Sequence, residues 1–150
     1  MRTASWVILA IVGALTMLGS MASCYVAYKA PDDQIGPVTL SQLTSGQPEA
    51  GTALRARRGT AAAYAGAFAT LFLAVVIWPY RRGDVWAWWA LLVGVGVLAV
   101  MVLLRVPFLD TRAGAGAGLI TLVVVGLALA LDARRLSSGA RPAAPASPPS

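Results

Sequence analysis

Three uncharged apolar runs follow one another through the sequence: GTAAAYAGAFATLFLAVVIWPY (residues 59–80), VWAWWALLVGVGVLAVMVLL (residues 85–104) and AGAGAGLITLVVVGLALAL (residues 113–131). About 20 helical residues rise roughly 30 Å, which is the thickness of the hydrocarbon layer of a bilayer. A charge at the centre of such a run costs about 2.5–3.5 kcal/mol on insertion scales. The three runs therefore predict three helices that cross a membrane.

A fourth apolar run precedes these three and predicts a span over about residues 5–28. Two alternatives stay open for this run. The letters SMA at residues 20–22 resemble a signal-peptide cleavage site, and MASC at residues 21–24 resembles a lipoprotein box in which Cys24 would carry lipid. The box has Met where Leu is commonest, and apolar residues follow it in place of a polar tether. We therefore favour an uncleaved first span.

The composition indicates that lipid surrounds most of the chain. Of the 150 residues, 58% are hydrophobic and only 12% are charged, whereas about 25% of residues are charged in soluble proteins. The predicted fold class is all-α, a transmembrane four-helix bundle that forms one membrane domain over residues 1–135. Residues 136–150 are rich in Pro, Ala and Ser, and we predict that they form a disordered tail. The predicted spans are about 5–28, 60–80, 85–104 and 113–131.

The connections between the spans differ in length. Residues 29–58 are expected to form a long first loop, because several prolines and glycines interrupt them. Within this loop, residues 38–43 are expected to make a short helical turn at the membrane interface, with Leu40 and Leu43 facing lipid. The connection RRGD at residues 81–84 is so short that the helices on either side of it must form an antiparallel hairpin.

The orientation in the membrane depends on the basic residues. Each face carries six of them in the four-span threading, so the positive-inside rule does not decide between the two orientations. Short loops carry most of the orienting weight, and the shortest loop holds Arg81 and Arg82. We therefore expect a multi-pass protein with both termini in the cytoplasm. Eleven of the twelve basic residues are Arg, and this bias, with the Ala, Gly and Val content, is typical of GC-rich bacterial coding and favours a bacterial plasma membrane.

The tryptophans all fall on the face of the termini in this threading. Their rings suit the boundary between headgroups and hydrocarbon, so the pattern predicts an asymmetric aromatic belt. The alternative is an aromatic-lined mouth for a lipid-like ligand. The residues are Trp6, Trp78, Trp86, Trp88 and Trp89.

Several kinds of chemistry are not expected from this sequence. It has no histidine and one cysteine, so zinc or iron sites built from His and Cys clusters and Ser-His-Asp triads are excluded. No ionisable residue lies inside the four runs, which argues against proton-coupled transport. We predict no metal and no cofactor. The arginines sit in small groups at span ends, where they anchor helices and attract lipid headgroups, so no nucleic-acid partner is expected.

The ionic groups on the long-loop face supply the candidate ligand-binding residues. Arg58 directly precedes the second span, and Arg105 directly follows the third. At the mouth of the bundle these arginines would pair with Asp110 or Asp33, or hold a lipid phosphate. We favour the simpler interpretation that they are surface anchors whose charged heads reach the interface.

The start of the last span predicts close helix packing. Gly114 and Gly118 are four residues apart and fit the small-xxx-small pattern that lets membrane helices approach closely. We therefore expect Gly118→Leu to lower stability more than Leu122→Ala does.

The segment YRRGDVWAWW at residues 80–89 is a charged turn that runs into a tryptophan-rich span. With the long first loop and the Arg-Gly pair at residues 58–59, this layout resembles small bacterial four-span membrane proteins of the DoxX-like kind over about residues 1–135. The resemblance implies a four-helix bundle and carries no catalytic residue across. We expect a non-catalytic accessory or structural membrane protein whose partners are the lipid bilayer and either itself or another membrane protein. The alternative is a small membrane enzyme or lipid-ligand binder that uses the Arg/Asp groups of the loop face.

Overall fold

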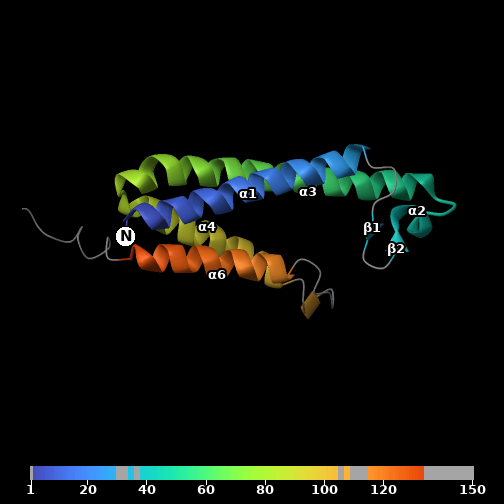
Figure 1. Ribbon diagram of the computed structural model, residues 1–150. Coiled ribbons are helices and arrows are strands. Elements are labelled where there is room, and N and C mark those ends of the chain that lie inside the picture. The colour runs from blue at the N-terminus through green and yellow to red at the C-terminus, as the bar shows by residue number, and fades with distance from the viewer. Residues whose placement is uncertain (1, 30–33, 36–37, 105–106, 109–114, 134–150) are drawn as a thin grey trace, which may run out of the picture. The chain divides into compact units, whose positions relative to one another are not determined.

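The computed structural model describes residues 2–29, 34–35, 38–104, 107–108 and 115–133. Within them the fold is almost entirely helical, which confirms the predicted all-α class (Figure 1). The chain divides into two compact units. We call Ala10–Ala74 the α1–α3 unit, and Met1–Leu9 together with Val75–Ser150 the α4–α6 unit. The elements are α1 (Arg2–Lys29), β1 (Gln34–Ile35), β2 (Val38–Thr39), α2 (Leu40–Leu43), α3 (Pro48–Val75), η1 (Val76–Tyr80), α4 (Val85–Leu103) and α6 (Ala115–Leu131).

Three helical stretches in the described part of the chain are long and apolar enough to cross a membrane, which is the character of a multi-pass membrane protein. They are Ala4–Lys29, Pro48–Tyr80 and Val85–Leu103, and they match the first three predicted spans. The apolar helix α6 has 17 residues, which rise about 25 Å against a hydrocarbon thickness of roughly 30 Å. The count of four spans therefore stays a prediction, and the predicted tail lies outside the described residues.

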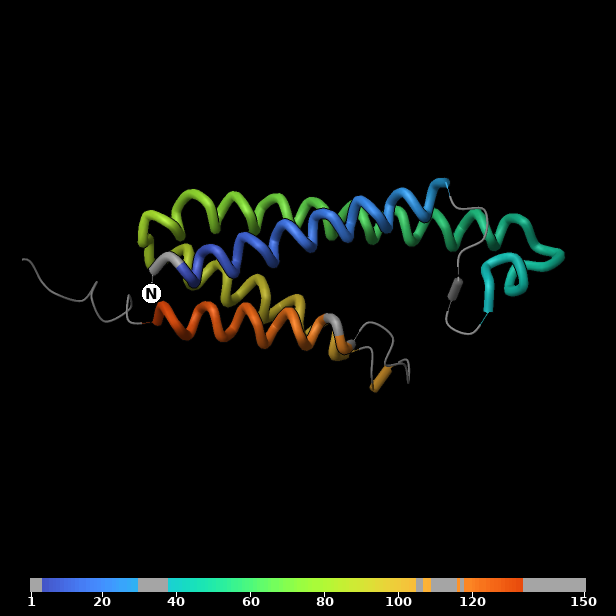
Figure 2. The backbone as a smooth tube through the Cα atoms, viewed as in Figure 1, coloured from blue at the N-terminus to red at the C-terminus, as the bar shows by residue number. Residues whose placement is uncertain are grey.

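In the α1–α3 unit, α1 and α3 run side by side in opposite directions (Figures 1 and 2). Their approach is close because glycines face the partner helix. A Cβ placed on Gly13 would lie 2.7 Å from Cδ2 of Leu73, and one placed on Gly66 would lie 3.1 Å from Oγ of Ser20. Thr70 also places its hydroxyl 3.7 Å from the sulfur of Met17. Small residues thus let these two helices approach closely.

The expected long loop is partly wrong, because α3 begins at Pro48 and residues 48–58 are helical. Proline at the start of a helix costs no hydrogen bond. The negative charge of Glu49 in the first turn stabilises the helix by interacting with the positive end of its dipole. The charges of residues 55–58 mark the edge of the uncharged run, whereas the helix itself continues seven residues further towards the N-terminus, to Pro48. The stretch Pro48–Tyr80 spans 33 residues, or about 50 Å, so its first turns extend beyond a hydrocarbon layer.

The rest of the loop contains a short helical turn at Leu40–Leu43, inside the predicted range 38–43, whereas Val38–Thr39 form a strand. Helix α2 follows a two-stranded antiparallel hairpin, β1 with β2, and starts with a capping box at Thr39 and Gln42. Leu43 is exposed, but Leu40 is buried, so the expectation that Leu40 faces lipid is wrong. The hydroxyl of Thr44 lies 3.3 Å from a Cβ built on Gly51. The end of α2 thus rests on the first turn of α3.

In the α4–α6 unit, α4 and α6 lie side by side and antiparallel (Figures 1 and 2). A Cβ placed on Gly118 would lie 2.8 Å from Cγ1 of Val102, so the two helices approach closely at this residue, as predicted. Gly114, the other member of the predicted pair, lies outside the described residues. The largest fully buried side chains among the described residues all belong to this unit. They are Ser5, Leu9, Val76, Tyr80, Val125 and Leu129.

Candidate functional site

The turn at residues 81–84 fixes the end of the α4–α6 unit that carries the most polar contacts. Gly83 has a φ of 101°, a left-handed conformation that residues with a Cβ avoid. Its amide donates to the carbonyl of Tyr80 at 3.1 Å, and the amide of Asp84 donates to the carbonyl of Pro79 at 3.1 Å. These two bonds form a Schellman motif, which ends the helix sharply. The predicted tight turn is therefore present.

Just before this turn the helix widens into the π-helical segment η1. Pro79 lies inside this segment and has no N–H to donate to the preceding turn. A π-helical turn is a common adjustment at such a position. Within this segment Tyr80 is fully buried, whereas Trp78, two residues earlier, is 65% exposed.

A buried chain of hydroxyl groups joins three segments of this unit. The hydroxyl of Ser5 donates to the carbonyl oxygen of Ala128 at 2.7 Å. Because this bond uses the only hydroxyl hydrogen of Ser5, Tyr80 donates its own to Oγ of Ser5, at 2.6 Å. Ala128 belongs to the last turn of α6, whose carbonyls have no partner within the helix. Ser5 therefore caps the C-terminal end of α6, and Tyr80 orients Ser5.

A second side chain caps the same helix end. Nε1 of Trp88 donates to the carbonyl oxygen of Leu129 at 2.9 Å, which ties α4 to the last turn of α6. Trp88 is buried, with only 8% of its surface exposed, so the prediction of a headgroup-facing ring is wrong for this residue. An indole N–H inside hydrocarbon needs a partner, and the carbonyl of Leu129 provides it. Trp78, Trp86 and Trp89 are at least half exposed, as a belt requires.

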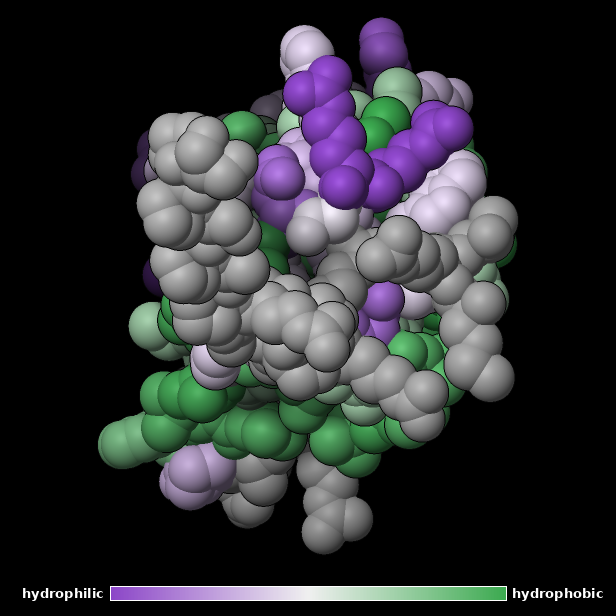
Figure 3. All heavy atoms as spheres, turned by 90° about the vertical axis from the view of Figure 1, so that its left-hand side faces the viewer, coloured by the Kyte–Doolittle hydropathy of each residue, from purple (hydrophilic) through white to green (hydrophobic). Residues whose placement is uncertain are grey.

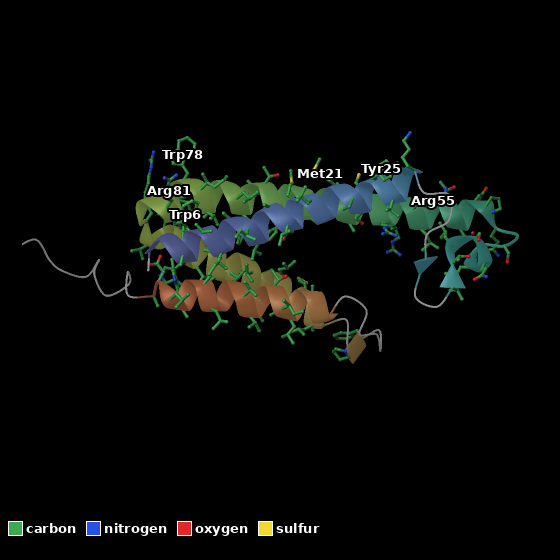
Figure 4. All side chains as sticks on the ribbon, viewed as in Figure 1. Trp6, Met21, Tyr25, Arg55, Trp78 and Arg81 are labelled. Atoms are coloured by element: carbon green, nitrogen blue, oxygen red, sulfur yellow. The ribbon has the colours of Figure 1, made fainter. Side chains whose placement is uncertain are left out.

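Two arginines at the turn rest on tryptophan rings. Cζ of Arg81 lies 5.1 Å from the ring centroid of Trp6, and Cζ of Arg82 lies 5.6 Å from that of Trp78. Both distances fall within the range of cation–π attraction. Figure 4 shows Trp6, Trp78 and Arg81 gathered at the end of the α4–α6 unit where the turn lies. Figure 3 looks onto this end and shows strongly hydrophilic side chains above a hydrophobic band.

Of the four candidate ligand-binding residues, the structure describes one. Arg58 is half-buried on α3, and its Nε donates to Oγ of Ser23 on α1 at 3.4 Å. Asp33, Arg105 and Asp110 lie outside the described residues, so their predicted approach to Arg58 stays a prediction. Cys24, the alternative lipidation site, is a half-buried free thiol within α1.

Sequence reasoning missed Ser5 and Tyr80, which make the most buried polar contact of the α4–α6 unit. A single serine near the start of an apolar run carries no pattern of its own. One signal was available: each residue stands within a turn of a span end, where helix carbonyls of a neighbouring span come free. In the part of the chain that the structure describes, no group of three or more His, Cys, Asp or Glu residues could hold a metal ion.

Comparison of the chain with known protein families, with curated proteins and with solved structures finds no match. The resemblance to DoxX-like proteins therefore stays a prediction.

Proposed function

We propose that this protein is a non-catalytic accessory or structural component of a bacterial plasma membrane, which packs with itself or with another membrane protein. One observation carries the proposal. At one end of the α4–α6 unit, three buried side chains form hydrogen bonds that lead to backbone carbonyls of α6. Tyr80 donates to Ser5, and Ser5 donates to the carbonyl of Ala128. Trp88 donates to the carbonyl of Leu129. These groups hold helices together, which is the use expected of a structural protein.

An exposed apolar stripe on α4 supplies the packing surface. Its members recur every three or four residues and therefore share one face of the helix. Each is 50–64% exposed, with no charge among them. Lipid or a neighbouring membrane helix covers such a face. The stripe is Trp86, Trp89, Val93, Val97 and Met101.

Cysteine crosslinking in membranes tests the proposal. In a Cys24→Ala background, Val97→Cys places a thiol on the exposed stripe, and Ala99→Cys places one on the buried side of the same helix. We expect Val97→Cys to give an oxidised dimer, or an adduct of another defined mass with a bifunctional thiol reagent, and Ala99→Cys to give neither. If both variants stay monomeric at native expression levels, the packing proposal fails.

Orientation forms part of the proposal, with both termini in the cytoplasm. The support is the shortest loop, in which Arg81 and Arg82 stand side by side. A reporter enzyme that is active only outside the cytoplasm, fused after Arg135, should be inactive. Activity of that fusion would reverse the assignment.

A second candidate function is a small membrane enzyme or a lipid-ligand binder centred on Arg58, since this half-buried arginine reaches across to Ser23 at 3.4 Å. A ligand phosphate would need such a charge near the edge of the apolar run. Arg58→Ala and Asp110→Ala should then abolish ligand binding or activity while leaving the helical content unchanged. Under the structural proposal these variants leave the Val97→Cys crosslink intact and remove no activity.

A further inference from the structure

We propose that Arg81 and Arg82, held by Trp6 and Trp78, form a binding site for the phosphate of an anionic phospholipid headgroup. The site lies entirely in the α4–α6 unit and shares no residue with the Arg58 candidate. It is independent of the proposed packing function, because a protein can bind a headgroup here whether or not it associates with a partner.

The arginine side chains are exposed but are not left to move freely. Arg81 lies over the ring of Trp6 at 5.1 Å, and Arg82 lies over that of Trp78 at 5.6 Å. A guanidinium held near the face of an aromatic ring still carries five N–H donors in a planar fork, and this fork matches two oxygens of a phosphate. Because the rings restrict the side chains beforehand, less rotamer freedom is lost when a phosphate binds.

The backbone beneath the arginines is also fixed. The Schellman motif at Gly83 and Asp84 ends the helix at this place, so Arg81 and Arg82 occupy defined positions in its last turn. Tyr80, directly before them, is fully buried and bonded to Ser5. The guanidinium groups thus project from an anchored helix end and not from a loose loop.

The position along the spans suits a headgroup. The arginines directly follow the uncharged run at residues 59–80 and precede the run at residues 85–104, so they lie where hydrocarbon gives way to phosphate. The exposed rings of Trp78 and Trp86 belong at the same depth. Arginines at this depth attract anionic lipids.

Charge favours an anionic headgroup over a zwitterionic one. The turn contributes two guanidinium groups and one carboxylate, that of Asp84, so its described charges sum to a positive value. Phosphatidylglycerol carries a net negative charge, whereas phosphatidylcholine carries none. The site should therefore prefer phosphatidylglycerol. High salt should weaken this preference, because it screens the attraction between exposed charges.

The experiment titrates dioleoyl-phosphatidylglycerol into the full-length protein in a mild neutral detergent and counts bound lipid by native mass spectrometry. Dioleoyl-phosphatidylcholine and inorganic phosphate are titrated in parallel. The test variants are R81Q/R82Q and the charge-retaining R81K/R82K. The matched control is R55Q/R57Q, which removes two exposed arginines from α3 in the other unit (Figure 4 labels Arg55). Far-ultraviolet circular dichroism confirms that each variant keeps its helical content.

We expect phosphatidylglycerol to bind R81Q/R82Q roughly 30-fold more weakly than the wild type, and R55Q/R57Q to bind it as the wild type does. The affinity of R81K/R82K should fall between these two values, because an ammonium keeps the charge and loses the planar fork.

Equal losses of affinity in R81Q/R82Q and R55Q/R57Q, or wild-type binding by R81K/R82K, would overturn the site in favour of unspecific charge. Equal occupancy by phosphatidylcholine or by inorganic phosphate at matched concentration would overturn the assignment to an anionic lipid. The Val97→Cys crosslink in membranes reports on the packing proposal separately.

Discussion

The hydroxyl oxygens of Ser5 and Tyr80 lie 2.6 Å apart in a fully buried position, although 75 residues separate them in the chain. The pair continues to the carbonyl oxygen of Ala128, 2.7 Å from Oγ of Ser5. Ser5 thus accepts a hydrogen bond from Tyr80 at the end of η1 and donates one to the last turn of α6. Both side chains are fully buried, so water does not reach either bond, and the pair links the three segments.

The Ser5 hydroxyl should contribute more to stability than that of Tyr80. Ser5→Ala removes two hydrogen bonds, the one that Ser5 accepts from Tyr80 and the one that it donates to the Ala128 carbonyl. This variant should lower the free energy of unfolding by about 1 kcal/mol. Tyr80→Phe keeps the Ser5–Ala128 bond and should cost less. The double variant should cost less than the sum of the two. Denaturation by SDS in mild detergent measures these values, with Thr60→Ala as control because its hydroxyl bonds back to its own helix at Ala56. Additive losses would contradict a shared chain of hydrogen bonds.

Trp88 should behave differently from the neighbouring tryptophans. Trp88→Phe removes the donor to the Leu129 carbonyl at 2.9 Å while keeping an aromatic ring, and should cost about 1 kcal/mol of unfolding free energy. Trp86→Phe changes an exposed ring and should cost close to nothing. Thermal unfolding followed by circular dichroism compares the two. If Trp86→Phe proves the more destabilising, the assignment of Trp88 as a cap of α6 is wrong.

The span positions could be predicted because one energy term dominates them. A charge in hydrocarbon is so unfavourable that uncharged runs of about 20 residues mark helices whatever their neighbours are. The RRGD turn was predictable for the same reason, since both flanking runs leave only residues 81–84 for it. Periodicity told us little, because spans surrounded by lipid are apolar on every side.

What the sequence did not predict depends on contacts between distant segments or on helix outside lipid. The start of α3 at Pro48 lies in a polar stretch where hydropathy carries no signal. The burial of Leu40 and Trp88 depends on which helix covers them, and the pairing of Ser5 with Tyr80 depends on a register between helices. Each of these needs three-dimensional neighbours that spacing along the chain does not contain.

Two glycines should respond in opposite directions to alanine. Gly83 adopts a φ of 101° in the Schellman turn, so Gly83→Ala should cost about 1–2 kcal/mol of unfolding free energy through left-handed backbone strain. Gly96 lies within α4 with no atom within 4 Å of a built Cβ, so Gly96→Ala should stabilise by up to about 1 kcal/mol. Melting temperatures in the same detergent compare them. A loss in both variants would contradict the open surroundings of Gly96.

Within α1, Gly13 and Gly19 form a matched pair for the packing of the α1–α3 unit. A Cβ on Gly13 would come within 2.7 Å of Leu73 and 3.1 Å of Phe72, whereas a Cβ on Gly19 meets nothing within 4 Å. Gly13→Ala should therefore lower unfolding free energy by roughly 1–3 kcal/mol, and Gly19→Ala should raise it slightly through helix propensity. Equal changes in an SDS titration would show that α1 and α3 do not approach each other here.

The close approach of α4 and α6 should make Gly118 more sensitive than a leucine one turn further along. A Cβ on Gly118 would lie 2.8 Å from Cγ1 of Val102, and a β-branched valine in a helix has one strongly preferred rotamer and cannot easily move aside. Gly118→Leu should therefore cost roughly 1–3 kcal/mol of unfolding free energy. Leu122→Ala should cost less, because a leucine side chain has nearly the same free energy against lipid tails as against a neighbouring membrane helix. Gly126→Ala is the control, since no atom lies within 4 Å of a Cβ built on Gly126. Equal losses for Gly118→Leu and Leu122→Ala in a detergent melt would mean that apolar bulk, and not backbone proximity, holds α4 against α6.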